Sequence, residues 1–225
     1  MSESERRFTP GRVEVRAAAA AEKRTIGGYA AKFNKPSQNL GGFIEVVDAR
    51  AFNDARGRDW PDVMARYNHD DNMLLGTTSA RTLRLDVDDT GLVYEVDPPQ
   101  SRADVYELVQ RGDVGKSSFS FRVVGEGGDE WGLSDQNFPL RTLRNVQLFD
   151  VGPVNAPAYL DTSSGLRSLA RHMDAPLEEV RQLAESDELK RFFVRTDRSS
   201  TSTRSTFGPA ARMALLGRKN GPGAA

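Results

Sequence analysis

The sequence predicts an α+β fold whose sheet is mostly antiparallel and is flanked by a few helices. Several short segments between residues 12 and 151 alternate polar and apolar side chains, as strands with one buried face do. Two other segments space their apolar residues mostly three to five apart, as amphipathic helices do. No repeat of fixed period is present, which argues against solenoids and propellers.

The first part of the chain predicts a leader, three strands and a short helix. Residues 1–10 are charged and lack periodicity, so we expect a disordered leader there. Strands are expected over 12–16 and 25–33, and a β-branched run predicts a third over 43–47. A short helix is expected over 49–54.

The middle of the chain predicts further antiparallel strands. Residues 81–87 and 92–96 alternate on either side of a turn rich in Asp and Gly, which indicates a hairpin. Alternation returns over 117–124, and a glycine-rich stretch over 125–132 predicts a loose turn. Residues 140–151 predict another strand or pair of strands.

Two helices are predicted by apolar spacing and by their end signals. The first spans 101–111, with Ser101 and Asp104 placed for a capping box and Gly112 placed as the residue after the helix. The second is expected to begin at Pro176 and to run for about five turns.

Composition excludes several classes of function. The 31 basic and 32 acidic residues give a net charge of -1, which provides no basic footprint for nucleic acid. The absence of cysteine excludes disulfides, thiolate nucleophiles, zinc fingers and iron–sulfur clusters. No apolar run approaches the roughly 20 residues of a membrane span, and the N-terminus lacks a signal-peptide core, so we expect a soluble intracellular protein.

The segment 116–123 is the most informative in the chain. On a strand, Phe119 and Phe121 would share a buried face, whereas Ser118 would lie on the opposite face with Lys116. There a hydroxyl can meet a substrate and a general base. The alternative is that this face is simply solvated.

His69 and Asp150 are the other residues that suggest chemistry. Imidazole can take and return a proton near neutral pH, which a serine nucleophile needs, and the only other histidine is His172. The alternative for His69 is a surface histidine beside two carboxylates. Asp150 lies inside an apolar strand, where a carboxylate needs a partner, and the alternative partner is an arginine.

Eight segments, taken in order, closely resemble the prohead (capsid maturation) proteases of tailed bacteriophages, which are distantly related to the herpesvirus assemblins. No single segment is decisive, but this many segments in the same order are specific to the family. They cover roughly residues 7–165. The segments are 7–14, 27–34, 43–52, Asn68-His69-Asp70, 76–78, 89–92, Ser117-Ser118-Phe119-Ser120-Phe121 and 150–158.

The resemblance implies roles for three residues. In that family a histidine beside an aspartate is the base, the serine before Phe-x-Phe is the nucleophile, and an acidic residue in the late strand orients the histidine. These roles fall on His69, Ser118 and Asp150. We expect the oxyanion donors to be backbone N–H groups in the 152–158 loop or near Arg122.

The chain departs from the family pattern at Ser117, Ser120 and Gly152, where Met, Gly and Ser are frequent. None of these departures removes a proposed catalytic atom, but the two serines are rival hydroxyls. Asp70 competes for the orienting role, yet as the neighbour of His69 on an extended strand it would point the other way. Lys116 is an alternative base, provided that it is desolvated enough to lose its proton.

The resemblance also implies an assemblin-like fold with a barrel-like sheet. The expected function is a serine endopeptidase that cleaves the scaffold segment of the major capsid protein, and itself, inside the phage procapsid in the host cytoplasm. Capsid and scaffold proteins are the expected partners, with self-association as a further expectation. No cofactor, metal, membrane or nucleic-acid partner is expected. The alternatives are a catalytically inactive capsid assembly protein and an unrelated β-rich binding module.

The domain organisation follows from these predictions. Residues 1–10 form the leader, 11–165 the protease core, 166–195 a C-terminal helical segment and 196–225 a disordered tail. The tail is a candidate for self-removal, with a passive linker or a tether to the capsid interior as the alternative. The substrate groove is expected along the exposed face that carries Lys116, Ser118 and Ser120.

Overall fold

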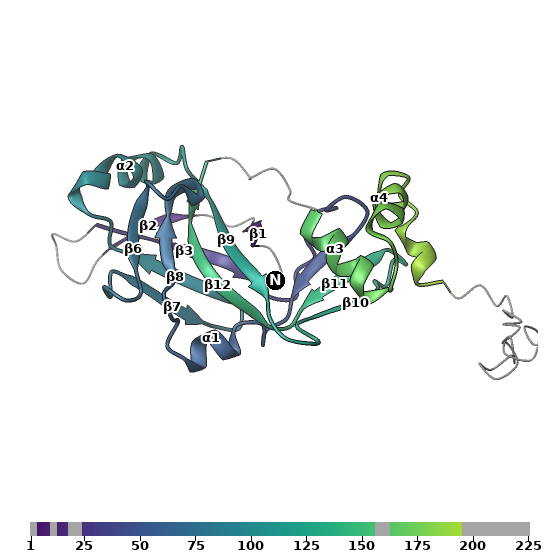
Figure 1. The fold of residues 1–225 in the computed structure, drawn as a ribbon. Coiled ribbons are helices and arrows are strands. Elements are labelled where there is room, and N and C mark those ends of the chain that lie inside the picture. The colour runs from purple at the N-terminus through teal and green to yellow at the C-terminus, as the bar shows by residue number, and fades with distance from the viewer. Residues whose placement is uncertain (1–3, 10–12, 18–23, 156–162, 195–225) are drawn as a thin grey trace, which may run out of the picture. The chain divides into compact units, whose positions relative to one another are not determined.

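The computed structural model describes residues 4–9, 13–17, 24–155 and 163–194, whose strands form three sheets (Figure 1). The first sheet has five strands in the order β1-β9-β12-β5-β6, the second three in the order β10-β11-β4, and the third four in the order β2-β3-β8-β7. The strands are β1 (Glu5–Thr9), β2 (Glu14–Ala17), β3 (Arg24–Lys32), β4 (Ile44–Val47), β5 (Met64–Arg66), β6 (Leu74–Thr77), β7 (Leu83–Val87), β8 (Gly91–Val96), β9 (Lys116–Val123), β10 (Asp129–Leu133), β11 (Pro139–Leu143) and β12 (Val146–Val154).

Short helices connect and flank these strands. They are α1 (Asn53–Gly57), α2 (Ala103–Arg111), α3 (Ser163–His172) and α4 (Leu177–Glu185), with single 3₁₀ turns η1 (Tyr67–His69), η2 (Gln100–Arg102) and η3 (Leu189–Phe192). No helix within the described ranges is long and apolar enough to cross a membrane.

The α+β class predicted from the sequence is confirmed, and most strand pairs are antiparallel. The exceptions are β11 with β4 and β12 with β5, which pair in parallel. The expected barrel-like sheet is not confirmed, because the pairing among the described strands gives three separate sheets and no closed barrel.

The expected disordered leader over residues 1–10 is wrong where β1 forms. Residues Glu5–Thr9 pair antiparallel with β9, and their side chains alternate between buried and more exposed positions. The local sequence did not predict this strand because two of its buried side chains, Glu5 and Arg7, are charged. They are stabilised by partners on β4 and β11, far away in the sequence.

The predicted hairpin at β7 and β8 is confirmed, as is Gly112, whose φ of 86° ends α2 in the left-handed conformation. The predicted capping box is wrong, because the helix is entered through η2 and no side chain caps it. The expected loose turn over 125–132 is wrong in its second half, because residues 129–132 belong to β10, which pairs antiparallel with β11.

The C-terminal helices differ most from their prediction. The expected five-turn helix is interrupted after α4, and a 3₁₀ turn, η3, follows. Helix α3 lies mostly inside the expected helical segment 166–195, but it was not predicted as a separate helix, because it opens on Ser-Ser-Gly, which are poor helix formers. Its Leu166 and Leu169 are nevertheless buried, so tertiary packing holds the helix. The predicted tail from 196 lies outside the described residues.

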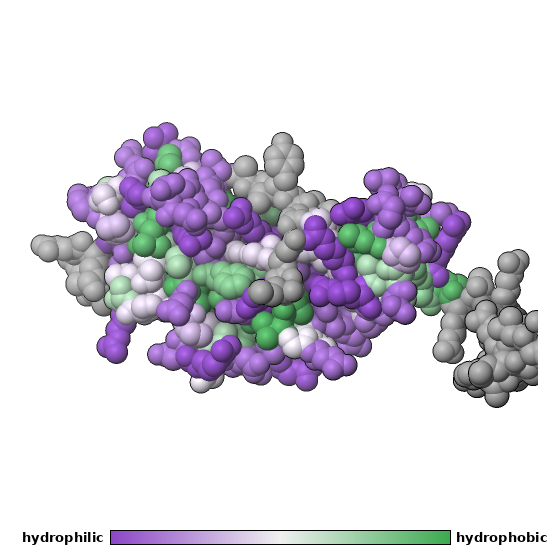
Figure 2. Space-filling view, viewed as in Figure 1, coloured by the Kyte–Doolittle hydropathy of each residue, from purple (hydrophilic) through white to green (hydrophobic). Residues whose placement is uncertain are grey.

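Two hydrophobic cores support the described chain. The larger core collects buried side chains from the first and third sheets, including Phe119 and Phe121. The smaller core joins α3, α4 and η3 to Phe43 and Trp131, whose rings meet edge to face at 5.0 Å. Figure 2 shows mostly hydrophilic side chains over α2 and α4, with apolar side chains visible over the central strands.

Candidate active site

Ser118 is the third residue of β9, which pairs with β1 on one side and with β12 on the other. As predicted, Phe119 and Phe121 are buried. The expectation that the opposite face of β9 is exposed is wrong for Ser118 and Ser120, which are 2% and 4% exposed. Ser118 is covered because its hydroxyl contacts both His69 and the backbone of β1.

His69 reaches this buried hydroxyl from a tight turn. Strand β5 leads into η1, in which Asn68 and His69 have φ values of 55° and 57°. The left-handed backbone is braced at Asn68, whose side-chain oxygen accepts a hydrogen bond from the Asn155 N–H at 3.0 Å. The expected extended strand at His69 is therefore wrong. Asp70 is exposed, in agreement with its rejection as the orienting acid.

Asp150 is brought to the same place by a β-bulge in β12. Leu148 pairs with Phe121, but Asp150 pairs with Ser120, so Phe149 is an extra residue in the ladder. In a regular strand Leu148 and Asp150 would share a face. The bulge turns Asp150 onto the face of Ser118 and Ser120 instead.

The three side chains form one connected chain of polar contacts, here called the candidate triad. Ser118 Oγ lies 2.6 Å from His69 Nε2, and His69 Nδ1 makes a short contact with Asp150 Oδ1. The His69 and Asp150 side chains are only 2% and 4% exposed. A hydroxyl, an imidazole and a carboxylate in this order can pass a proton away from the oxygen while the carboxylate holds the ring in place.

Asp150 has a second partner that the sequence did not reveal. Arg66 Nη1 lies 3.6 Å from Asp150 Oδ2 and 2.7 Å from a carboxylate oxygen of Asp71. The alternative of an arginine partner is thus present together with the histidine. Asp150 is paired with Met64 in the register of β12 and β5, and sequence alone does not give that register.

The other residues considered for the site are not part of the candidate triad. Ser117 Oγ is 3.1 Å from the Tyr94 hydroxyl, and Ser120 Oγ is 2.9 Å from Ser4 Oγ. Lys116 is exposed, so the desolvation that a neutral lysine base requires is missing. His172, in the last turn of α3, is also exposed.

Gly152 lets β12 pass close to the turn that carries His69. A Cβ atom added at this position would lie 2.0 Å from the carbonyl oxygen of Arg66. No side chain fits at such a distance, so glycine permits the close approach of the two backbones. Gly152 is also the register partner of Ser118 on β9.

A second buried polar group, here called the ion cluster, was missed by the sequence analysis. It consists of Glu5 and Arg7 on β1, Glu45 on β4 and Arg141 on β11, each no more than 7% exposed. Burial alone would lower the pKa of Arg7, but Glu45 and Glu5 outweigh this effect and raise that pKa above its ordinary value. In a chain with 31 basic and 32 acidic residues, local pattern does not distinguish these four.

The described residues contain no group of three or more His, Asp or Glu side chains placed to hold a metal ion.

Comparison with known proteins assigns the family. A family model described as Caudovirus prohead serine protease matches residues 11–175. The chain belongs to this family. No curated protein and no solved structure matches. The members of the candidate triad all lie inside the matched region, whereas β1 lies before it. The expected relationship to herpesvirus assemblins is not tested by these comparisons and stays a prediction.

Proposed function

We propose that this prohead protease is a serine endopeptidase in which Ser118 is the nucleophile, His69 the general base and Asp150 the orienting group. The observation that carries the proposal is the continuous buried contact from the Ser118 hydroxyl through the His69 ring to the Asp150 carboxylate. The binding-module alternative predicts a large separation of Ser118 and His69, and their 2.6 Å contact argues against it.

The mechanism follows from the order of the contacts. His69 Nε2 takes the hydroxyl proton as Ser118 Oγ attacks a peptide carbonyl carbon, and it returns that proton to the leaving amine. Asp150 accepts a hydrogen bond from Nδ1, which leaves Nε2 facing the serine. Water then attacks the carbonyl carbon of the acyl-enzyme. His69 takes a proton from this water and returns it to Ser118 Oγ as the ester bond breaks.

The substrates proposed are the scaffold segment of the major capsid protein and the protease itself. Membership in a prohead protease family supports this assignment, since the family acts in capsid maturation. The site of action would be the interior of the procapsid in the host cytoplasm, where enzyme and capsid protein are confined together.

The test is co-expression of the full chain with the major capsid protein of the same phage, followed by intact-mass measurement of both. We expect the capsid protein to be shortened by the wild type and to stay full length with Ser118→Ala. Ser120→Ala is the matched control, because it removes a buried hydroxyl two residues along the same strand, and it should keep the shortening. Equal processing by wild type and Ser118→Ala would contradict the proposal and favour a catalytically inactive assembly protein.

A further inference from the structure

Strand β1 lies where a peptide substrate would have to lie. Phe8 is the register partner of Ser118, and Ser118 Oγ donates a hydrogen bond to the carbonyl oxygen of Arg7 at 2.8 Å. The same hydroxyl lies 2.6 Å from His69 Nε2. The peptide bond between Arg7 and Phe8 is therefore held beside the candidate nucleophile by an antiparallel strand pairing.

We propose that β1 is an intramolecular substrate that is cleaved between Arg7 and Phe8, and that the ion cluster selects peptides with the pattern Glu-x-Arg before the cut. The inference rests on the proposed function of Ser118, His69 and Asp150, and adds to it a recognition sequence and a specific bond in the chain.

Arg7 occupies a pocket that matches its shape and charge. Its Nε and Nη2 atoms donate to the two carboxylate oxygens of Glu45 at 2.8 and 3.0 Å. The guanidinium also lies over the ring of Phe121, 5.6 Å from its centroid. Paired donors in a fixed fork fit a planar guanidinium, whereas the single ammonium of a lysine supplies a point charge without this geometry. The pocket therefore favours arginine immediately before the cut.

Glu5, two residues earlier, is recognised in a similar way. Arg141 donates to its carboxylate through Nη1 at 2.7 Å and Nη2 at 3.0 Å. Arg141 is 1% exposed and is also held by Asp129 at 2.7 Å, so its position is fixed. Arg6, between the two recognised residues, is exposed. The pattern therefore requires Glu and Arg and tolerates any residue between them.

The recognition site is suited to repeated use. Strand β1 brings one negative and one positive side chain, so its departure does not change the net charge of the ion cluster. Glu45 would still pair with Arg141, at 3.0 Å, and Arg141 with Asp129. A buried carboxylate and a buried guanidinium would thus remain in place for the next peptide that carries the same two charges.

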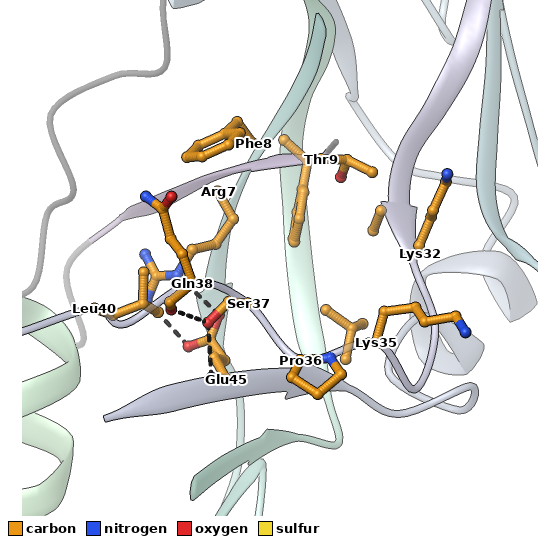
Figure 3. A pocket seen from close by; sticks show the side chains of 13 residues that line it. Arg7, Phe8, Thr9, Lys32, Lys35, Pro36, Ser37, Gln38, Leu40 and Glu45 are labelled. Carbon is orange, nitrogen blue, oxygen red and sulfur yellow. Dashed lines mark hydrogen bonds and ion pairs between the residues drawn. The ribbon is translucent and has the colours of Figure 1, made fainter. Parts of the chain in front are cut away.

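Space beside β1 allows the strand to leave. A cavity of about 410 Å³ borders its Arg7, Phe8 and Thr9 residues and the loop 35–38. Figure 3 shows the Arg7 side chain turned toward Glu45 at one side of this cavity. The strand is also at the edge of its sheet among the described residues, so only the pairing with β9 ties its backbone to that sheet.

The cleavage needs one rearrangement. Ser118 has a single hydroxyl proton, and while that proton is donated to the Arg7 oxygen it is not available to His69. After a shift of the strand, Ser118 Oγ bonds to the Arg7 carbonyl carbon and its proton moves to His69. The bond to the Phe8 nitrogen then breaks, and His69 protonates that nitrogen. Water hydrolyses the ester, which gives a free Arg7 carboxylate and restores the hydroxyl of Ser118.

The first experiment follows the intact mass of the purified full chain over time. We expect loss of residues 1–7 from the wild type, giving a chain that begins at Phe8, and no loss from Ser118→Ala. Arg7→Gln should slow the cut at least about 100-fold because it removes the charge that Glu45 recognises. Arg6→Gln is the matched control, the same substitution at the exposed neighbour, and it should leave the rate unchanged. A contaminating trypsin-like protease would cut after Arg6 as well and would also cut Ser118→Ala.

Because Arg7→Gln disturbs a buried cluster, a second measurement uses unchanged protein. A peptide of residues 4–9 is added to the wild type, together with versions carrying Gln at the positions of Glu5, Arg6 or Arg7. We expect cleavage after Arg7, at least about tenfold slower with either recognised residue replaced and unchanged with Arg6 replaced. Equal cleavage of all four peptides would overturn the inference.

The two proposals fail in different ways. Shortening of the capsid protein that depends on Ser118, with an intact N-terminus and uncut peptides, would overturn the recognition of β1 and leave the proposed function standing. No cleavage of capsid protein, chain or peptide by the wild type would overturn both.

Discussion

The candidate triad and the ion cluster are both buried, and both join strands that are distant in the sequence. They differ in the face of the sheet on which they lie and in the charges that make their contacts. Pleating places Ser118 and Asp150 on one face of the first sheet, whereas Arg7 lies on the face of Phe119 and Phe121. In the ion cluster each charge meets an opposite charge at 2.7–3.0 Å. In the candidate triad the decisive contact joins a neutral hydroxyl to an imidazole.

This difference shows what burial does to each kind of group. A buried charge is tolerated when it is paired, and breaking one pair leaves an uncompensated charge in a medium of low dielectric. A buried hydroxyl costs much less to remove, because no charge is left behind. Substitutions in the triad should therefore affect the reaction with little change in stability, whereas substitutions in the ion cluster should lower the stability of the fold in addition to any effect on peptide recognition.

The largest expected effect is that of Ser118→Ala on the rate of proteolysis, with little change in stability. Ser118→Ala should reduce the rate of proteolysis by at least about 10⁴-fold, since the nucleophile is lost. Its free energy of unfolding should change by only about 1 kcal/mol. Cleavage assays on capsid protein and thermal melts of the same preparation check both values. A melting temperature lower by many degrees would place this hydroxyl among the structural groups.

Asp150→Asn tests whether the carboxylate orients His69 or serves the fold through Arg66. We expect a fall in rate of roughly 10²- to 10⁴-fold, because the amide no longer holds the productive tautomer of the ring. Asp71→Asn is the control, since Asp71 is the exposed second partner of Arg66 and should be dispensable. An Asp150→Asn protease with the rate of the wild type would remove Asp150 from the triad.

Arg141→Met is the matching test of the ion cluster. The substitution leaves Glu5, Glu45 and Asp129 with fewer cationic partners, so the free energy of unfolding should fall by about 3–5 kcal/mol. Urea denaturation measures this change. Arg144→Met removes a more exposed arginine from the same segment and should have a much smaller effect. A similar fall in the free energy of unfolding in both variants would show that burial does not determine how much an ion pair stabilises the fold.

The smallest expected effect concerns a surface pair just after β4. Arg50 hydrogen-bonds to Asp48 and, with nearby Arg144, holds the pKa of that carboxyl below its ordinary value. This stabilisation is present above the unfolded pKa of about 3.9 and is lost as the pH falls through the lowered folded value. Arg50→Gln should therefore lower the melting temperature slightly at pH 7 and not at pH 2. An effect as large as that of Arg141→Met would contradict the contrast between surface and buried pairs.

The parts of the fold that the sequence predicted well are those set by local signals. Turn residues between β7 and β8 predicted the hairpin, and Gly112 predicted the end of α2. Strand β1 was missed because its stability depends on Glu45 and Arg141 rather than on its own pattern. Helix α3 was not predicted as a separate helix for a similar reason, since packing outweighs the weak helix propensity of its first residues.

The site shows the same division between local and distant causes. The Ser-Phe-x-Phe alternation and the scarcity of histidine made Ser118 and His69 candidates, and the resemblance to the prohead proteases gave them their expected roles. Their burial, however, depends on the left-handed turn at His69 and on β1, which no periodicity predicts. The orientation of Asp150 depends on one extra residue in β12, and a bulge is visible only once the register with β9 is known.

The separation of β1 from its partners also has a consequence for the order of synthesis. Arg7 and Ser118 are 111 positions apart, and Glu5 and Arg141 are 136 apart. At ribosomal speeds of about 5–20 residues per second, β1 is made roughly 5–20 s before β9. Asp150 follows later still. A growing chain therefore holds His69 with no Ser118 beside it, and under the proposed mechanism we expect no peptidase activity until nearly all of the family region has been translated.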